Sequence, residues 1–362
     1  MGRSILIAAG GTGGHLYPGI AVADELVRRD PDTHVVFVGT PRGLESRIVP
    51  RSGYGLELLP VLPLNAVGAR GLLWGLLALP RGMGRALRLV RSLRPQAVLG
   101  IGGYAGGPVA LVAALLGVRT VILEPNARPG FTNRVLLPFA DVAACAYEET
   151  RVAFGRKGVL TGNPVRGGFA TLPRRDHAHP LTLLAFGGSQ GSRVLNRALV
   201  AALPHLPGEE RLRIVHQTGE HMQAEVEDAY RLARRPAQIR PFLDDMERVM
   251  GEADVVLSRS GATTCAELTV GGRAAVLVPF AQAADDHQRT NARALASAGA
   301  ARMIEEKDLT GVSLGEALCA LVDAPDRIRD MEDAARSLGR PDAAARVADL
   351  LVSPDASEGE PC

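Results

Sequence analysis

Gly10-Gly11-Thr12-Gly13-Gly14-His15 decides the fold, because an apolar run, residues 4–9, precedes it and an amphipathic run, residues 17–29, follows it. Apolar residues in the second run recur at the spacing of one helix face, and Pro18 suits a first helical turn. The order is therefore strand, glycine loop and helix N-terminus. Such a loop exposes backbone N–H groups and lets a ligand approach the chain closely, with His15 in reach of it.

The glycine pattern excludes two common nucleotide sites. In the dinucleotide fingerprint G-x-G-x-x-G, Gly11 and Gly13 fit, but Leu16 occupies the last position. The next predicted strand, residues 34–39, ends without the acidic residue that would hold a ribose. A Walker loop is excluded because no Lys-Ser or Lys-Thr follows the glycines.

Composition bounds the class of protein. The chain has 362 residues and 46% hydrophobic content, enough for two domains with cores, and its net charge of +2 gives no argument for nucleic acid. Cys145, Cys265, Cys319 and Cys362 have no metal-ligand spacing, so we expect free thiols in a reducing cytosol. No apolar run is long enough for a transmembrane helix, and the N-terminal run is too short for a signal peptide.

Short apolar runs alternate with helical stretches along the whole chain. The predicted strands are residues 4–9, 34–39, 97–101, 119–123, 142–146, 181–186, 212–217, 238–242, 254–258 and 274–279. A second glycine loop, residues 187–192, repeats the opening order of strand, loop and helix. The pattern predicts an α/β protein with two Rossmann-like, doubly wound parallel-sheet domains that face each other across a cleft.

The expected domain boundaries follow from changes in the pattern. Residues 1–162 form the first domain, and residues 163–340, after a linker-like Gly162–Arg166 stretch, form the second. Residues 341–352 are expected to be a helix that returns to the first domain. The small, acidic tail, residues 353–362, is expected to be disordered.

Ligands of such sheets bind at the carboxyl ends of the strands, so the loops there are the candidate site. Residues 102–108 and 124–130 are two such loops, and Asn126 offers an amide that suits sugar hydroxyls. Residues 259–266 form a small-residue turn into a helix, suited to phosphate, and Glu267 is expected to expose a carboxylate to a ribose diol. A polar cluster, residues 280–292, could bind a sugar. Taken alone, each feature also fits an ordinary turn, a helix cap or a first-turn acid.

Residues 70–95 carry the only tryptophan, a dense leucine cluster and six arginines. This segment cannot span a bilayer, but it can lie on an anionic membrane surface. The alternative is a pair of amphipathic helices packed on the sheet. We favour the membrane for Leu72, Leu73, Trp74, Leu76, Leu77, Leu79 and Met83, and expect Leu87, Val90 and Leu93 in the core.

Seven motifs, in this order and spacing, carry a family resemblance: Gly10–His15, Gly103–Pro108, Glu124–Asn126, Gly162–Arg166, Gly187–Gly191, Ser258–Glu267 and Asp285–Gln288. From residue 4 to about residue 350, the chain resembles the MurG family of GT-B glycosyltransferases. Members of that family transfer N-acetylglucosamine from UDP-N-acetylglucosamine to lipid I (undecaprenyl-pyrophosphoryl-muramoyl-pentapeptide), giving lipid II for peptidoglycan, cell shape and cell division. The resemblance implies an inverting mechanism with no cofactor and no obligatory metal.

The resemblance also implies residue roles. The UDP-N-acetylglucosamine contacts would be Thr12, Gly13, Gly14, Asn126, Arg166, Ser189, Leu243, Ala262, Thr263, Thr264, Cys265, Ala266, Glu267 and Gln288. Glu267 would bind the ribose hydroxyls, Leu243 would present its backbone to uracil, and Gln288 would bind the sugar. His15, Tyr104 and Glu124 would contact the acceptor. The chain departs from the commoner pattern at Pro125, Pro241 and His287.

His15 is the candidate general base, because an imidazole titrates near neutral pH; an acceptor-binding role stays open beside it. The expected location is the cytoplasmic face of the plasma membrane, as a peripheral protein, with other cell-wall synthesis proteins as candidate partners and no nucleic acid. The rival functions are a GT-B enzyme acting on another lipid such as diacylglycerol, a UDP-N-acetylglucosamine 2-epimerase, and a non-catalytic nucleotide-sugar sensor or scaffold.

Overall fold

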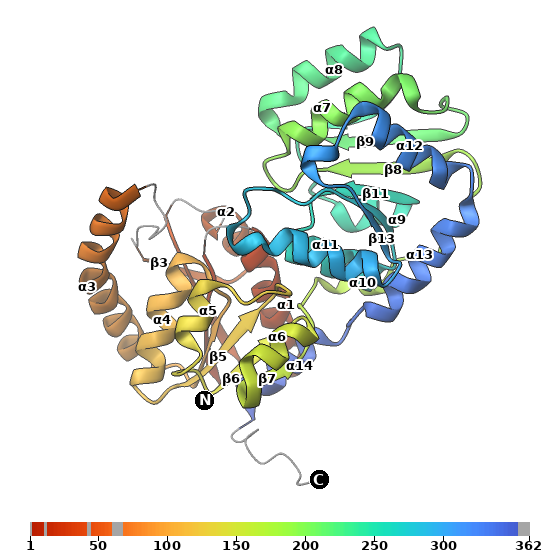
Figure 1. The fold of residues 1–362 in the computed structure, drawn as a ribbon. Coiled ribbons are helices and arrows are strands. Elements are labelled where there is room, and N and C mark those ends of the chain that lie inside the picture. The colour runs from red at the N-terminus through yellow and green to blue at the C-terminus, as the bar shows by residue number, and fades with distance from the viewer. Residues whose placement is uncertain (1, 11–12, 42–44, 60–67, 354–362) are drawn as a thin grey trace. The chain divides into compact units, whose positions relative to one another are not determined.

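The structure, a computed structural model, describes residues 2–10, 13–41, 45–59 and 68–353, without the side chains of residues 13, 68–80, 104, 105 and 284. The chain forms two compact units (Figure 1). Unit 1 contains Met1–Arg166 and Arg340–Cys362, and unit 2 contains Gly167–Gly339. The expected tail lies outside the described residues from residue 354 onward.

Unit 1 is built on a parallel sheet in the order β3-β2-β1-β4-β5-β6-β7. Its strands are β1 (Ser4–Ala8), β2 (His34–Gly39), β3 (Gly55–Leu58), β4 (Ala97–Gly100), β5 (Arg119–Glu124), β6 (Val142–Cys145) and β7 (Gly158–Leu160). The helices are α1 (Gly13–Arg29), α2 (Glu45–Arg51), α3 (Gly68–Leu93), α4 (Gly103–Leu115), α5 (Phe131–Leu136), α6 (Glu148–Phe154) and α14 (Ala343–Val352).

Helices cover both faces of this sheet, as Figure 1 shows. Ile5 and Ile7 of β1 share a core with α1 and α14, whereas Leu6 and Ala8 share a core with α3 and α4. Because successive strand residues point to opposite faces, the continuous apolar run of β1 fills both cores. Burial of each such side chain contributes roughly 1.5–3 kcal/mol.

Unit 2 repeats the plan with a parallel sheet in the order β10-β9-β8-β11-β12-β13. Its strands are β8 (Leu181–Phe186), β9 (Leu212–Gln217), β10 (Gln238–Arg240), β11 (Val255–Ser258), β12 (Ala274–Leu277) and β13 (Ala301–Met303). The helices are α7 (Arg193–Ala202), α8 (Gln223–Leu232), α9 (Met246–Glu252), α10 (Ala262–Gly271), α11 (His287–Ser297), α12 (Gly311–Val322) and α13 (Pro325–Leu338). Leu183 and Val255 share one core with α7 and α12, and Leu184 and Val256 are buried on the other face.

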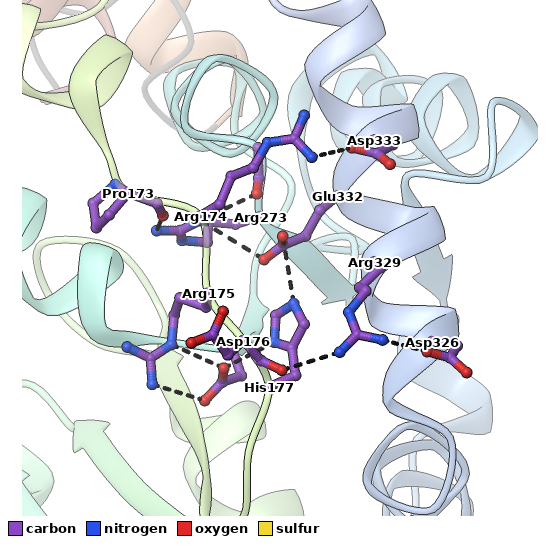
Figure 2. Close-up of polar contacts among 12 residues, drawn as sticks. Pro173, Arg174, Arg175, Asp176, His177, Arg273, Asp326, Arg329, Glu332 and Asp333 are labelled. Carbon is purple, nitrogen blue, oxygen red and sulfur yellow. Dashed lines mark hydrogen bonds and ion pairs between the residues drawn. The ribbon is translucent and has the colours of Figure 1, made fainter.

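A buried ionic network fixes the segment that leads into β8 (Figure 2). The Asp254 carboxylate accepts hydrogen bonds from Arg175 Nε at 2.8 Å and from the Thr182 N–H at 2.7 Å, and lies 2.9 Å from His177 Nδ1. On its other side, His177 Nε2 lies 3.5 Å from a Glu332 oxygen of α13. Asp254 and His177 have no exposed side-chain surface, so the network joins α13 to the amino-terminal edge of this sheet.

The ten predicted strands are confirmed within a few residues at their ends. Three strands were missed: β3, β7 and β13 are sheet edges of three or four residues, and β3 and β7 have no fully buried residue. Such strands lack the apolar run on which the prediction depends.

Two helix starts were placed too late. The helix expected near Pro18 begins at Gly13, and the one expected after Pro108 begins at Gly103, so Gly13–His15 and Gly103–Pro108 are helical. Glycine has a low intrinsic helix propensity, which is why the sequence pattern favoured loops.

Three further expectations concern side chains and membranes. Cys145, Cys265 and Cys319 form no disulfide within the described part of the chain, as expected, and Cys362 lies outside it. Val90 is buried in the core, with Leu87 and Leu93 partly buried against it, as expected. Within the described part of the chain, no helix has the length and apolar character needed to cross a membrane.

Candidate functional site

In unit 1 the strand order reverses between β1 and β4, the point where doubly wound sheets bind ligands. His15 lies in the first turn of α1, after β1, and a Cβ atom built on Gly102, after β4, would lie 3.6 Å from its Nε2. Gly103 has φ +73°, and a Cβ there would come within 2.2 Å of the Gly10 carbonyl oxygen. The two chain segments therefore approach closely beside the imidazole. Gly11 and Thr12 lie outside the described residues, as does the side chain of Tyr104.

Glu124, the last residue of β5, organises the next loop at this edge. Its carboxylate accepts hydrogen bonds from the Asn126 N–H and Nδ2, both at 3.1 Å, from the Gly130 N–H at 2.8 Å and from Asn133 Nδ2 at 2.9 Å. The residue is 1% exposed, and burial, opposed by these four donors, raises the pKa of its carboxyl. This geometry lets Glu124 position the Asn126 amide. The acceptor contact that the resemblance implies for Glu124 stays a prediction.

Asn126 and Arg166 lie at the same edge with partly exposed side chains. The Asn126 carbonyl accepts a hydrogen bond from the Thr150 hydroxyl at 2.7 Å, which fixes the loop from a second side. The Arg166 guanidinium lies over the Tyr17 ring at 4.7 Å from its centroid, a cation–π contact. The preceding residues 161–165 are buried, so this stretch is packed into unit 1 and is not a loose linker.

In unit 2 the strand order reverses between β8 and β11. The glycine loop after β8 begins there, and it packs tightly, because a Cβ on Gly191 would lie 2.1 Å from the Thr218 carbonyl oxygen. Ser192 caps α7 by accepting the Leu195 N–H, while Ser189 stays exposed. No sequence pattern indicated the contact with Thr218, which is 27 positions away.

On the other side of this reversal, α10 begins after β11. The N-cap residue, Gly261, has no side chain to cap the helix. The first backbone N–H groups of α10 and the positive end of its dipole lie at the carboxyl end of β11. Glu267 is 6% exposed, so the expectation of an exposed carboxylate was wrong: the residue lies on the buried side of α10 with Thr263. Leu243 is also buried, which leaves its backbone as its polar part.

The loop between β12 and α11 leads to Gln288 in the first turn of α11, and the geometry of this loop is unusual. Asp285 and Asp286 are consecutive non-glycine residues with φ of 53° and 55°. Gln288 Oε1 accepts the Phe280 N–H at 3.1 Å, and its carbonyl accepts the Ser260 hydroxyl at 2.8 Å. Asp286 is the N-cap residue of α11 but makes no cap; its carboxylate instead accepts from Arg289. The backbone of this loop is therefore strained and held by side chains.

Two residues of this edge were missed by sequence reasoning. Arg259 is buried and donates to the Val278 and Pro279 carbonyls at 3.2 and 3.1 Å, and to a Glu306 carboxylate oxygen at 2.7 Å. Glu306 follows β13, a strand that the sequence pattern did not predict, so no signal linked it to the site.

A cavity of about 460 Å³ in unit 1, lined by Gln96, Arg119 and Asp141 among others, lies at the edge of its sheet opposite the candidate site.

Comparisons with known proteins agree with this layout. The N-terminal domain of glycosyltransferase family 28 matches residues 5–145, and the C-terminal domain of that family matches residues 182–347. A protein of Anaeromyxobacter sp. (strain Fw109-5), named UDP-N-acetylglucosamine–N-acetylmuramyl-(pentapeptide) pyrophosphoryl-undecaprenol N-acetylglucosamine transferase, is 48% identical over 96% of this chain and 92% of its own length.

Solved structures similar to this chain include a MurG protein and others that share its fold. The crystal structure of Acinetobacter baumannii MurG is 32% identical, with a TM-score of 0.78, over 97% of this chain and 99% of that one. A UDP-N-acetylglucosamine 2-epimerase structure, 13% identical, with a TM-score of 0.67 over 96% of this chain and 95% of that one, shares the fold alone.

Proposed function

The chain belongs to glycosyltransferase family 28, and on that premise we propose that it is the inverting transferase that moves N-acetylglucosamine from UDP-N-acetylglucosamine to lipid I. The observation that carries the proposal is 48% identity, over nearly the whole chain, to a relative named for that reaction. Polar groups at the strand-order reversals of both sheets supply the contacts that the reaction needs.

Unit 2 is the proposed donor site. The N-terminus of α10, residues 262–266, and the glycine loop with Ser189 hold the UDP diphosphate, since helix N-termini and glycine-rich turns favour anions. Glu267, on the buried side of α10, accepts from the ribose hydroxyls, and the Leu243 backbone pairs with uracil. Gln288 binds the sugar through Nε2, because Oε1 is used by the Phe280 N–H.

Unit 1 supplies the proposed chemistry and acceptor contacts. His15 takes the proton of the muramoyl 4-hydroxyl while that oxygen attacks the anomeric carbon, and Gly13 and Gly14 contact the donor sugar. The bond from that carbon to UDP breaks in the same displacement, so the configuration inverts and UDP leaves. Arg166 and the α10 dipole stabilise the charge that develops on the leaving diphosphate. Asn126, held by Glu124, contacts the donor sugar, and Tyr104 contacts the acceptor.

The proposed location is an anionic membrane surface, where the lipid substrate resides. Residues 58–123 contain seven arginines and no aspartate or glutamate. On α3, Arg81, Arg85, Arg88 and Arg91 are exposed, which suits anionic headgroups. The side chains of Leu72, Leu73, Trp74, Leu76, Leu77 and Leu79 lie outside what the structure describes, and Met83 is half-buried against the core.

Exposed apolar side chains extend this surface beyond α3. Helix α3 packs on α4, and α4 packs on α5, so the three lie side by side on one face of the sheet (Figure 1). Leu115 at the end of α4 and Phe131, Val135 and Phe139 in and after α5 are exposed, with Arg134 among them. An apolar and basic surface of this kind fits the interface of an anionic bilayer.

The experiment that tests the proposed function measures UDP release with no acceptor, a short-chain lipid I analogue or diacylglycerol. We expect release with the lipid I analogue. Release only with diacylglycerol would favour a different lipid glycosyltransferase. Release of UDP together with free 2-epimerised sugar in the absence of an acceptor would favour the epimerase. Absence of release under all three conditions would favour a nucleotide-sugar sensor or scaffold.

A further inference from the structure

The Glu306 carboxylate makes two contacts at the donor edge of unit 2. One oxygen, Oε2, accepts from Arg259 Nη1 at 2.7 Å and from the Ala281 backbone N–H at 3.4 Å. The side chain is 24% exposed and that of Arg259 is 10% exposed, so the pair is partly shielded from water. A charge-assisted hydrogen bond in such surroundings is stronger than one at the surface.

Arg259 carries this contact to the strand that leads into the Gln288 loop. The same Nη1 group donates to the carbonyls of Val278 and Pro279, and the guanidinium lies 5.4 Å from the centroid of the Phe280 ring. Glu306 and Arg259 therefore hold four consecutive residues, 278–281, from two directions. The Nη1 group is engaged within unit 2 in this way, which gives Arg259 a scaffold role at this edge.

The clamped residues set the orientation of Gln288. The Phe280 N–H donates to Gln288 Oε1 and fixes which end of that amide faces outward. The next N–H in the chain, that of Ala281, is the one that donates to Glu306. The loop between them contains the left-handed Asp285 and Asp286, a conformation that costs of order 1–3 kcal/mol per residue and persists only where its surroundings impose it. The clamp is therefore part of what imposes this conformation and keeps the amide in place.

We propose that Glu306 is a positioning residue for sugar recognition: through Arg259 and the Ala281 N–H it holds the loop that presents Gln288 Nε2 to the N-acetylglucosamine of the donor. This inference rests on the proposed function, because it takes the ligand of the loop to be that sugar. Glu306 touches neither the nucleotide nor the reacting atoms. Its removal weakens recognition of the sugar and leaves recognition of UDP in place.

The test compares Kd values for UDP-N-acetylglucosamine and for UDP, measured by titration calorimetry on the full chain without an acceptor. We expect Glu306→Leu to raise the Kd for UDP-N-acetylglucosamine about tenfold, and that for UDP by less than about twofold, since loss of one charge-assisted contact corresponds to that factor. Glu306→Gln keeps an acceptor oxygen for both donors, so it recovers most of the affinity and serves as the second variant if Glu306→Leu folds poorly. The matched control is Asp326→Ala, which removes an acid whose side chain is 89% exposed on α13.

Four outcomes would contradict the proposal. Equal loss of affinity for both ligands would show that Glu306 acts on the whole nucleotide site, and a Glu306→Gln variant as weak as Glu306→Leu would show that its acceptor oxygen is not what matters. Unchanged affinities in both variants would overturn the inference and leave the proposed function intact. A wild-type protein that binds UDP but not UDP-N-acetylglucosamine would overturn both.

Discussion

Glu124 Oε1 accepts hydrogen bonds from both the backbone N–H and the side-chain Nδ2 of Asn126, each at 3.1 Å. The carboxylate that ends β5 thereby orients the amide two residues later. Two further donors, from Gly130 and Asn133, occupy its other oxygen. A glutamate here therefore fixes the orientation of the Asn126 side chain.

We expect Glu124→Gln to lower kcat/KM about tenfold or more, because one amide oxygen cannot accept all four hydrogen bonds and the amide NH₂ faces N–H groups. Steady-state kinetics with both substrates measure this loss. Glu149→Gln, an exposed acid on the neighbouring α6, is the matched control. An unchanged kcat/KM in Glu124→Gln would show that Asn126 does not need this support.

His15→Ala is expected to lower turnover far more than UDP affinity, because the imidazole acts on the acceptor hydroxyl and UDP binds to unit 2. Turnover is measured with a lipid I analogue, and UDP affinity by calorimetry. Equal losses in the two quantities would place His15 in nucleotide binding instead.

The fold was largely readable from the sequence, and the reasons are specific. All residues of β1 but Ser4, and all residues of β8 but Thr182, are apolar because both sheet faces are covered, so these strands stand out next to the glycines that follow them. Gly13 and Gly103 misled the prediction because their helical state depends on packing against strand ends and not on propensity. Local sequence carries no information on such contacts.

The site was readable only in part. Asn126, Gln288 and the α10 turn lie at the strand ends where the pattern placed them. The burial of Glu124 and Glu267, and the pairing of Arg259 with Glu306, depend on residues from separate strands meeting at one edge. No spacing in the chain indicates which side of a helix or loop will be covered.

Phe131→Ser combined with Val135→Ser is expected to weaken binding to phosphatidylglycerol-containing vesicles by about tenfold, because two apolar side chains no longer enter the interface. Co-sedimentation with anionic and with zwitterionic vesicles measures the change. Leu232→Ser, on the exposed face of α8 in unit 2, is the control. Equal vesicle binding by the double variant and the wild-type protein would remove α5 from the membrane surface.

Asp254→Asn is expected to destabilise unit 2 by about 2 kcal/mol, because the buried side chain loses its charge-assisted contact with Arg175 and gains an NH₂ group that faces donors. Urea unfolding measures the free energy. The KM for UDP-N-acetylglucosamine should not change, since Asp254 precedes β11 and lies at the sheet edge opposite the donor residues. Figure 2 shows Arg175 and His177, which contact Asp254. Asp333→Ala, which breaks an exposed ion pair with Arg174 in the same region, should leave stability unchanged. A stable Asp254→Asn variant would show that the network contributes little.

His216 predicts a pH dependence of stability. Burial lowers its pKa from 6.5 to about 4, with Nε2 3.2 Å from Asn196 Oδ1 and Nδ1 3.2 Å from the Tyr230 hydroxyl. The unfolded chain therefore binds a proton as the pH falls below 6.5 while the folded chain does not. The stability contribution is present above pH 6.5 and is lost as the pH falls towards 4, by roughly 3 kcal/mol in all.

Urea unfolding between pH 7 and pH 4 checks this contribution. The wild-type free energy of unfolding should fall more steeply with decreasing pH than that of His216→Asn. Parallel pH curves for the two proteins would show that His216 does not titrate differently in the folded and unfolded states.

The most direct test of the account is the mass of the lipid product. Purified protein is incubated with UDP-N-acetylglucosamine and a short-chain lipid I analogue, and UDP and lipid are quantified together. The account predicts one UDP released for each lipid that gains one N-acetylhexosamine. UDP release with no change in lipid mass, or no UDP release at all, would contradict it.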